Sequence, residues 1–192
     1  MLRKQYESEK IYDHGLLKGT KRSFQEIAEE EKRKLKAVCG HHSYGIHQLF
    51  PQPSKYITML REPVDRVISS YYFLRDFKGY EYVKEMTLEQ FVQTHPEAQN
   101  LQTFLLSGLP PEKSLKKAKE NLKNCKVVGL TERFDESVFL IKQELQWTNL
   151  GYKRLNVTQK RLIKQELPLS TICLIEKYNQ LDIELYKLAK QL

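Results

Sequence analysis

The clearest pattern of apolar and polar positions lies in residues 55–76, KYITMLREPVDRVISSYYFLRD. Its first apolar residues, within Tyr56–Leu60, follow the pattern of a short buried strand. From Val64 the apolar residues recur at helical spacing, and Pro63 suits the first turn of a helix because it has no N–H to leave unsatisfied. We therefore predict a strand, a tight turn that begins at Arg61, and a helix.

The turn at Arg61 combines features that suit an anion. A helix N-terminus offers free backbone N–H groups and the positive end of the helix dipole, and here it directly follows a guanidinium. Ser69 and Ser70 lie two turns into the predicted helix. An ordinary strand–helix unit with a surface arginine is the alternative, and this pattern alone leaves it open.

The rest of the chain alternates short apolar runs with longer helical patterns. The apolar runs predict strands at residues 36–39, 55–60 and 126–130. Helical spacing and capping signals predict helices at residues 2–12, 24–35, 87–91 and 111–123, a helix that ends at Trp147, and a last helix at 171–190 capped by Ser170. This order predicts an α/β fold, with a short parallel sheet covered by helices on both faces, in a single domain over residues 1–192.

The charge of the chain indicates an anionic partner without naming it. There are 32 Lys and Arg residues against 24 Asp and Glu residues, a net charge of +8. The excess is spread along the chain, and no helix-turn-helix, RRM-like or zinc pattern occurs, so we do not expect nucleic-acid binding. A nucleotide, a sulfated glycan or an acidic membrane surface also fits this charge.

Cysteine usage and hydropathy favour a cytoplasmic protein. Cys39, Cys125 and Cys173 are far apart and odd in number, which is typical of reduced thiols rather than of a disulfide framework. No apolar run approaches the roughly 18 residues that a membrane span needs. The polar N-terminus, MLRKQYESEK, is unlike a signal peptide.

Paired histidines follow the predicted strand at residues 36–39. The segment GHHSYGIH places His41 and His42 just after a glycine, where side chains often face a cleft, and histidine can accept a proton near neutral pH. Ordinary loop histidines are the alternative. A metal site formed by His41, His42 and His47 is less favoured than either interpretation, because no acidic or cysteine ligand has a matching spacing.

The segment REPVDRVISSYYF closely resembles the 3′-phosphate-binding segment of sulfotransferases that use 3′-phosphoadenosine 5′-phosphosulfate (PAPS). The most similar family is that of heparan sulfate 2-O-sulfotransferase and its bacterial members. The resemblance implies that Arg61 and Ser69 hold the 3′-phosphate of the nucleotide. GHHSYGIH is similar to the family segment that carries the proposed base, which implies that His41 deprotonates the acceptor hydroxyl.

Further segments extend the resemblance along nearly the whole chain: NLQTFLLSG at 100–108, VVGLTERFDESVFLIKQEL at 127–145 and NQLDIELY at 179–186. In relatives a basic loop that corresponds to residues 152–161 closes over the nucleotide, which implies that Lys160 or Arg161 contacts a phosphate. Phe104 stands where an arginine is common. Animal members are Golgi proteins, so the family analogy implies membrane association, although nothing in this chain anchors it.

The resemblance implies a P-loop-NTPase-like three-layer sandwich from which one part is missing. In relatives the first strand leads into a loop of the type PKTGGTT that holds the 5′-phosphosulfate, and residues 1–192 contain no such loop. YESEKIYD at 6–13 resembles the segment that follows that loop and its helix. We therefore expect a missing first strand and an open slot beside residues 55–60. A misassigned start and a truncated, inactive copy are both open explanations.

The function implied by resemblance is transfer of a sulfuryl group from PAPS to a hydroxyl, on a carbohydrate acceptor, without a metal. Because electrostatic stabilisation by the missing loop is lost, we predict weak nucleotide binding and poor turnover for residues 1–192. The alternative is a non-catalytic remnant that binds anions or nucleotides. No oligomeric state is indicated.

Overall fold

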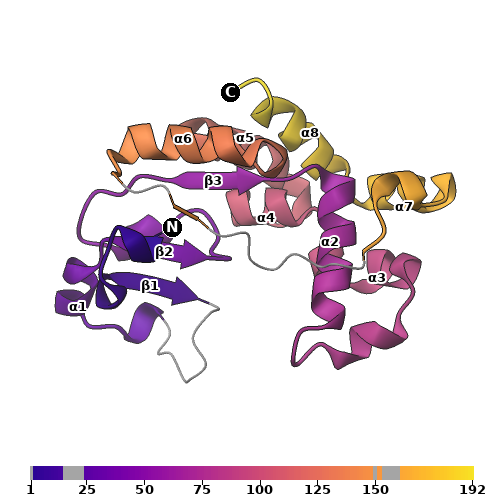
Figure 1. The fold of residues 1–192 in the computed structure, drawn as a ribbon, viewed down its shortest axis with the longest axis horizontal. Coiled ribbons are helices and arrows are strands. Elements are labelled where there is room, and N and C mark those ends of the chain that lie inside the picture. The colour runs from indigo at the N-terminus through magenta and orange to yellow at the C-terminus, as the bar shows by residue number, and fades with distance from the viewer. Residues whose placement is uncertain (1, 15–23, 149–150, 153–160) are drawn as a thin grey trace.

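A computed structural model of the chain describes residues 2–14, 24–148, 151–152 and 161–192 (Figure 1). Its four strands are β1 (Ile11–His14), β2 (Ala37–Gly40), β3 (Ile57–Leu60) and β4 (Val127–Leu130). β1 pairs with β2 and β3 pairs with β4, both in parallel. The three predicted strands are confirmed, but the expected single sheet is wrong in the described part of the chain, where the strands form two separate pairs.

Eight α-helices are present in the described residues: α1 (Glu29–Lys34), α2 (Pro63–Arg75), α3 (Leu88–Thr94), α4 (Leu101–Ser107), α5 (Pro111–Asn124), α6 (Phe134–Leu145), α7 (Leu169–Tyr178) and α8 (Gln180–Ala189). Short 3-10 turns join them at Leu2–Lys4, Ser8–Lys10, Phe24–Glu26, Ile46–Leu49, Glu81–Glu85, Pro96–Ala98, Thr131–Arg133 and Lys164–Glu166. The helices predicted after Val64, from Thr87, at 111–123 and before Trp147 are confirmed, and Thr87 and Gln90 form a reciprocal capping box at α3.

Three local predictions are wrong. Residues 2–12 form two short 3-10 turns and the start of β1 instead of a helix. The helix expected at 24–35 is a 3-10 turn followed by α1. The helix expected at 171–190 is two helices separated at Asn179, and the first begins after Pro168, so Ser170 is not its cap.

Helices cover both faces of the β3–β4 pair, as predicted. Along β3 and β4 alternate residues point to opposite faces. On one face Leu60 and Leu130 pack with residues of α4, α5 and α8. On the other face Met59 and Val127 pack near Ile141 of α6. The pair is therefore a small sandwich whose two strands end beside α2.

The open slot expected beside residues 55–60 has a counterpart in the strand pairing. Within the described residues β3 pairs with β4 only, so its second edge carries no strand. β2 likewise pairs only with β1 there. The arrows of β1, β2 and β3 point the same way in Figure 1, so the ends of both pairs lie on the side of the molecule that carries α2.

Helix α2 is fixed by a second core on its inner face. Val64, Val67 and Ile68 are fully buried, and they belong to a cluster that also contains Phe91 of α3 and Ile175 of α7. This burial determines which side of α2 faces inward. Asp65 and Ser69, which lie four residues apart, therefore share its outer side.

Candidate anion site at the end of strand β3

Arg61 directly follows the last residue of β3, and its side chain contacts Asp65 one turn into α2. The guanidinium Nε donates a hydrogen bond of 2.7 Å to Asp65 Oδ2, and Nη2 also contacts this oxygen. Arg161 Nη1 lies 3.2 Å from the other oxygen, Asp65 Oδ1. Two of the four predicted site residues therefore converge on one carboxylate that the sequence did not single out.

Ser69 lies on α2 four residues after Asp65, and residues at this spacing are neighbours on a helix surface. Its side chain is half-buried. Arg61, Asp65 and Ser69 thus follow one another at four-residue intervals along the outer side of the turn and helix. Lys160, the other basic residue considered for phosphate contact, lies outside the described residues.

The helix N-terminus next to Arg61 is not as open as predicted. The carboxylate of Glu62 accepts a 2.7 Å hydrogen bond from the Asp65 N–H, and the Glu62 carbonyl accepts one of 2.8 Å from the Arg66 N–H. The Asp65 amide is therefore already capped, which corrects the expectation of free N–H groups at this point. The candidate anion site therefore depends on the guanidinium groups.

Further charged and polar side chains surround the turn at Arg61. Lys164 Nζ lies 3.2 Å from Glu62 Oε1, and the Glu62 N–H donates to Glu132 Oε1 at 2.7 Å. Tyr186 donates to the other oxygen of Glu132, and burial together with this carboxylate raises the pKa of Tyr186 to about 12. Arg61 and Arg161 thus pair with Asp65, and Lys164 lies near both Glu62 and Glu176. Asp65 is bound to both arginines, so it competes with an anion that binds the two guanidiniums together.

The backbone of Arg61 is held by the side chain of Gln102. The Arg61 N–H donates to Gln102 Oε1 at 2.8 Å, and Gln102 Nε2 donates to the Arg61 carbonyl at 3.0 Å. Gln102 lies in the first turn of α4. The buried carboxylate of Asp182 accepts hydrogen bonds from the backbone N–H of Gln102 at 3.2 Å and from that of Thr103 at 2.7 Å. The site is thereby connected to the C-terminal helices.

A buried polar network connects residues 100–103 (NLQT) with residues 179–182 (NQLD). Asn179 Oδ1 accepts hydrogen bonds from Arg66 Nη2 at 2.9 Å and from the Asn100 N–H at 3.0 Å. Asn100 Oδ1 in turn accepts the N–H groups of Leu181 and Asp182. Both segments were noted in the sequence for their likeness to the family, but their mutual contact was not predicted. The polar residues at buried positions of apolar helices were the available signal.

His41 is an exposed residue directly after β2. The preceding Gly40 has φ 134°, a backbone conformation that favours glycine and turns the chain at the end of the strand. In the described residues no hydrogen bond or ion pair joins His41 to Arg61 or Ser69. His41 and Arg61 directly follow β2 and β3, and the arrows of these two strands point the same way in Figure 1.

The other histidines of this loop have structural contacts. His42 lies beside the Tyr12 ring, with centroids 5.8 Å apart. His47 Nδ1 is 2.9 Å from the Tyr56 hydroxyl, which also accepts the N–H groups of Gly45 and His47. Across the described residues, no group of three or more His, Cys, Asp or Glu residues could hold a metal ion.

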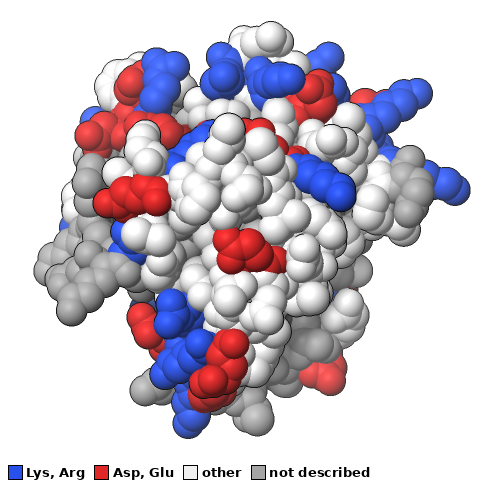
Figure 2. Space-filling view, turned by 90° about the vertical axis from the view of Figure 1, so that its right-hand side faces the viewer, with Lys and Arg blue, Asp and Glu red and all other residues white. Residues whose placement is uncertain are grey.

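Figure 2 shows the side of the molecule that carries α2, α3 and α7. Lys and Arg side chains lie mainly around the rim of this face, and its middle is uncharged except for an acidic group near the centre. The net charge of +8 is therefore not concentrated in the middle of this face. No helix in the described part of the chain is both long and apolar enough to cross a membrane.

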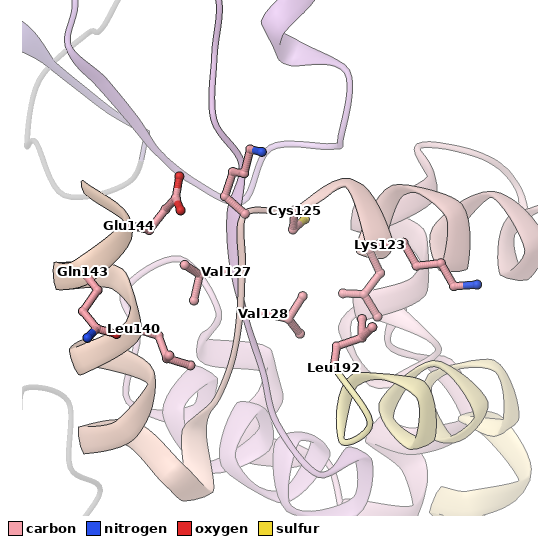
Figure 3. A pocket seen from close by; sticks show the side chains of 10 residues that line it. Lys123, Cys125, Val127, Val128, Leu140, Gln143, Glu144 and Leu192 are labelled. Carbon is pink, nitrogen blue, oxygen red and sulfur yellow. The ribbon is translucent and has the colours of Figure 1, made fainter. Parts of the chain in front are cut away.

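A pocket of about 520 Å³ lies at the opposite end of the β3–β4 pair from Arg61 (Figure 3). It is lined by Lys126, Val127 and Val128 at the start of β4, by residues of α5 and α6, and by Leu192. Because β3 and β4 are parallel, the start of β4 is the end remote from Arg61. The pocket is thus separate from the candidate anion site.

Comparison with known families gives a partial match that covers the candidate site. A family model described as "Sulfotransferase domain" matches residues 17–104, a stretch that contains His41, Arg61 and Ser69. The match supports a sulfotransferase family with a P-loop-like α/β fold and sulfuryl transfer as its general chemistry, in agreement with the short parallel sheets seen here. Searches of curated proteins and of solved structures gave no significant match.

Proposed function

We propose that this chain acts with PAPS as sulfuryl donor and a hydroxyl group of a carbohydrate as acceptor. The observation that carries the proposal is the convergence of Arg61 and Arg161 on Asp65, beside Ser69 on the outer side of α2. Two guanidiniums and a hydroxyl are donors that suit a phosphate dianion. Arg61 and Ser69 also lie inside the stretch that matches a sulfotransferase domain.

In the proposed reaction, Arg61, Ser69 and Arg161 bind the 3′-phosphate of the donor, and Asp65 gives up its contacts with the two arginines. His41 accepts the proton of the acceptor hydroxyl as its oxygen attacks sulfur in line. The S–O bond to the 5′-phosphate breaks, and 3′,5′-adenosine bisphosphate leaves. The exposure of His41 supports this role, since a general base must be accessible to the acceptor.

A second candidate function is nucleotide binding without catalysis. Residues 1–192 contain no loop of the phosphosulfate-binding type, and the residues proposed here would bind the 3′-phosphate end of the donor. A chain with this half of the site binds the bisphosphate but lacks stabilisation of the departing phosphate. We propose a single domain and a cytoplasmic setting for either function, the latter because Cys39, Cys125 and Cys173 are odd in number and far apart in the sequence.

Calorimetry with 3′,5′-adenosine bisphosphate and with 5′-AMP tests the nucleotide site. The wild type should bind the bisphosphate more tightly, and Arg61→Ala should weaken that binding roughly tenfold or more, since hydrogen bonds to charged groups contribute about 1.5–3 kcal/mol. Arg75→Ala is the matched control, because Arg75 lies in the last turn of α2 and stacks near Tyr71 and Tyr72. Equal affinity of the wild type for both nucleotides would overturn the proposal.

Transfer of labelled sulfate from PAPS to a desulfated polysaccharide separates the two functions. Catalysis requires measurable transfer by the wild type, together with loss of transfer but not of bisphosphate binding in His41→Gln. His47→Gln is the control for a histidine change in the same loop, because the His47 ring contacts the Tyr56 hydroxyl and has no proposed role in catalysis. Binding without transfer in the wild type would favour the non-catalytic module.

A further inference from the structure

We propose that Gln102 is a positioning residue for Arg61 and that it sets the selectivity of the site for a 3′-phosphate. The inference rests on the proposed nucleotide-binding function. Gln102 is not a ligand in this proposal, because its amide is already engaged by the Arg61 backbone. It acts by fixing the direction in which the Arg61 side chain leaves the end of β3.

The geometry of the contact is specific to an amide side chain. The Gln102 side chain accepts a hydrogen bond from the Arg61 N–H and donates one to the Arg61 carbonyl, so a single side chain holds both backbone polar groups of Arg61. A primary amide supplies the donor and the acceptor together, whereas a carboxylate supplies only acceptors and a hydrocarbon supplies neither. Gln102 is only 9% exposed, so water does not readily replace these bonds.

The backbone that carries Gln102 is anchored to the core. The fully buried Asp182 accepts the N–H groups of Gln102 and Thr103, which fixes the first turn of α4. The same carboxylate lies 3.6 Å from Nε of Arg66, which belongs to α2. Gln102 and α2 are thus held by one group, and the Arg61 turn lies between them.

This arrangement affects selectivity because Arg61 is the junction between strand and helix. Rotation of its peptide groups would move the guanidinium away from Asp65 and Arg161, and the two guanidiniums could then no longer act on one phosphate. Binding of a nucleotide without a 3′-phosphate does not depend on that geometry. Loss of Gln102 should therefore weaken binding of the bisphosphate and leave binding of 5′-AMP nearly unchanged.

The test is the ratio of the dissociation constants for 5′-AMP and 3′,5′-adenosine bisphosphate, measured by calorimetry on the full chain. Gln102→Met keeps the size of the side chain without its hydrogen bonds, and we expect the ratio to fall about tenfold, as for loss of one hydrogen bond to a charged group. Gln102→Asn keeps a neutral amide on a side chain that is one methylene shorter and should also lower the ratio, which keeps the test valid if the Met variant does not fold.

Ser107→Ala is the matched control. Ser107 lies on the same helix and is 7% exposed, and its hydroxyl forms hydrogen bonds with the Phe104 and Leu109 backbone, so its loss should reduce stability without changing the ratio. A Gln102 variant that loses stability but keeps the wild-type ratio would overturn the inference alone. Absence of any preference for the bisphosphate in the wild type would overturn the proposed function and this inference with it.

Discussion

Arg66 of α2 and Asp182 of α8 form an ion pair in the interior of the protein, with Arg66 Nε 3.6 Å from Asp182 Oδ2. Arg66 is 7% exposed and Asp182 is fully buried. The guanidinium also donates to the Glu97 carbonyl at 2.6 Å and to Asn179 Oδ1 at 2.9 Å. Burial lowers the pKa of Arg66, and the nearby Asp182 carboxylate opposes this effect. The pair therefore connects the helix that follows Arg61 to the C-terminal helix.

Replacement of Asp182 should strongly destabilise the protein. Asp182→Ala leaves the Arg66 charge buried without its counter-ion and removes the acceptor of two α4 amides, so we expect a loss of about 3–5 kcal/mol in the free energy of unfolding. Urea denaturation measures this loss. Glu184→Ala, an exposed change on the same helix, should cost less than about 0.5 kcal/mol. Similar losses in both variants would contradict the role of the buried pair.

The parts of the fold that the sequence predicted are those with a strong local pattern. The apolar runs of β2, β3 and β4 and the capped, periodic segments of α2 and α3 needed no knowledge of their neighbours. β1 was missed because only Ile11 and Tyr12 are apolar in its four residues. The break at Asn179 was missed because the apolar spacing of α7 continues into α8. Apolar periodicity gives no sign that a polar residue such as Asn179 is buried between the two helices.

The same distinction between local patterns and distant contacts applies to the residues of the candidate site. Arg61 and Ser69 could be proposed from one continuous segment and its resemblance to a family. Asp65 and Gln102 could not, since their roles depend on contacts with Arg161 and with the Arg61 backbone, far away in sequence. The capping of the Asp65 amide by Glu62 was local and could have been read from the acidic residue that precedes Pro63.

Removal of the Asp65 charge should strengthen anion binding. In the structure Asp65 occupies the guanidiniums of Arg61 and Arg161, so Asp65→Asn leaves one negative charge fewer to displace. We expect affinity for 3′,5′-adenosine bisphosphate to rise about fivefold at low salt, a gain of about 1 kcal/mol, and the gain to shrink at high salt. Asp76→Asn, after the last turn of α2, is the control and should change little. A loss of affinity in Asp65→Asn would mean that Asp65 orients the arginines instead of competing with the ligand.

Gly129 in β4 should tolerate no side chain. An added Cβ would collide with the Met59 sulfur and lie 2.9 Å from the Cβ of Ser137 on α6. Gly129→Ala should therefore lower the free energy of unfolding by about 1–3 kcal/mol, the usual range for overpacking. Met59→Ala removes one of the clashing groups, so the double variant should be more stable than the sum of the two single effects predicts. Strict additivity in urea denaturation would argue against this contact.

The cysteines should differ in reactivity according to their burial. Burial raises the pKa of Cys125 to about 11, whereas Cys173 is exposed on α7. Because the thiolate is the reactive form, iodoacetamide near pH 8 should label Cys173 at least roughly tenfold faster than Cys125. Mass spectrometry of the labelled peptides gives both rates, and labelling in denaturant should abolish the difference. Equal rates in the native protein would show that Cys125 is accessible.

His95 should make stability depend on pH. Burial lowers the pKa of His95, an effect that the Glu97 carboxylate opposes. The neutral ring is stacked on Phe91, its Nδ1 accepts the Glu97 N–H at 3.2 Å, and its Nε2 lies 3.1 Å from the Tyr82 hydroxyl. Since Nδ1 acts as an acceptor, protonation would break this hydrogen bond. The folded state therefore favours the neutral form of the ring.

The sign of the effect follows from proton binding in the two states. As the pH falls below about 6.5, the unfolded chain binds a proton at His95 before the folded protein does, so the free energy of unfolding decreases down to the lowered folded-state pKa and His95 adds no further change below it. His95→Phe keeps the stacking on Phe91 without the titrating group and should reduce the slope of stability against pH in this window. Urea denaturation of both proteins at several pH values measures the two slopes, and equal slopes would exclude His95 as a source of the pH dependence.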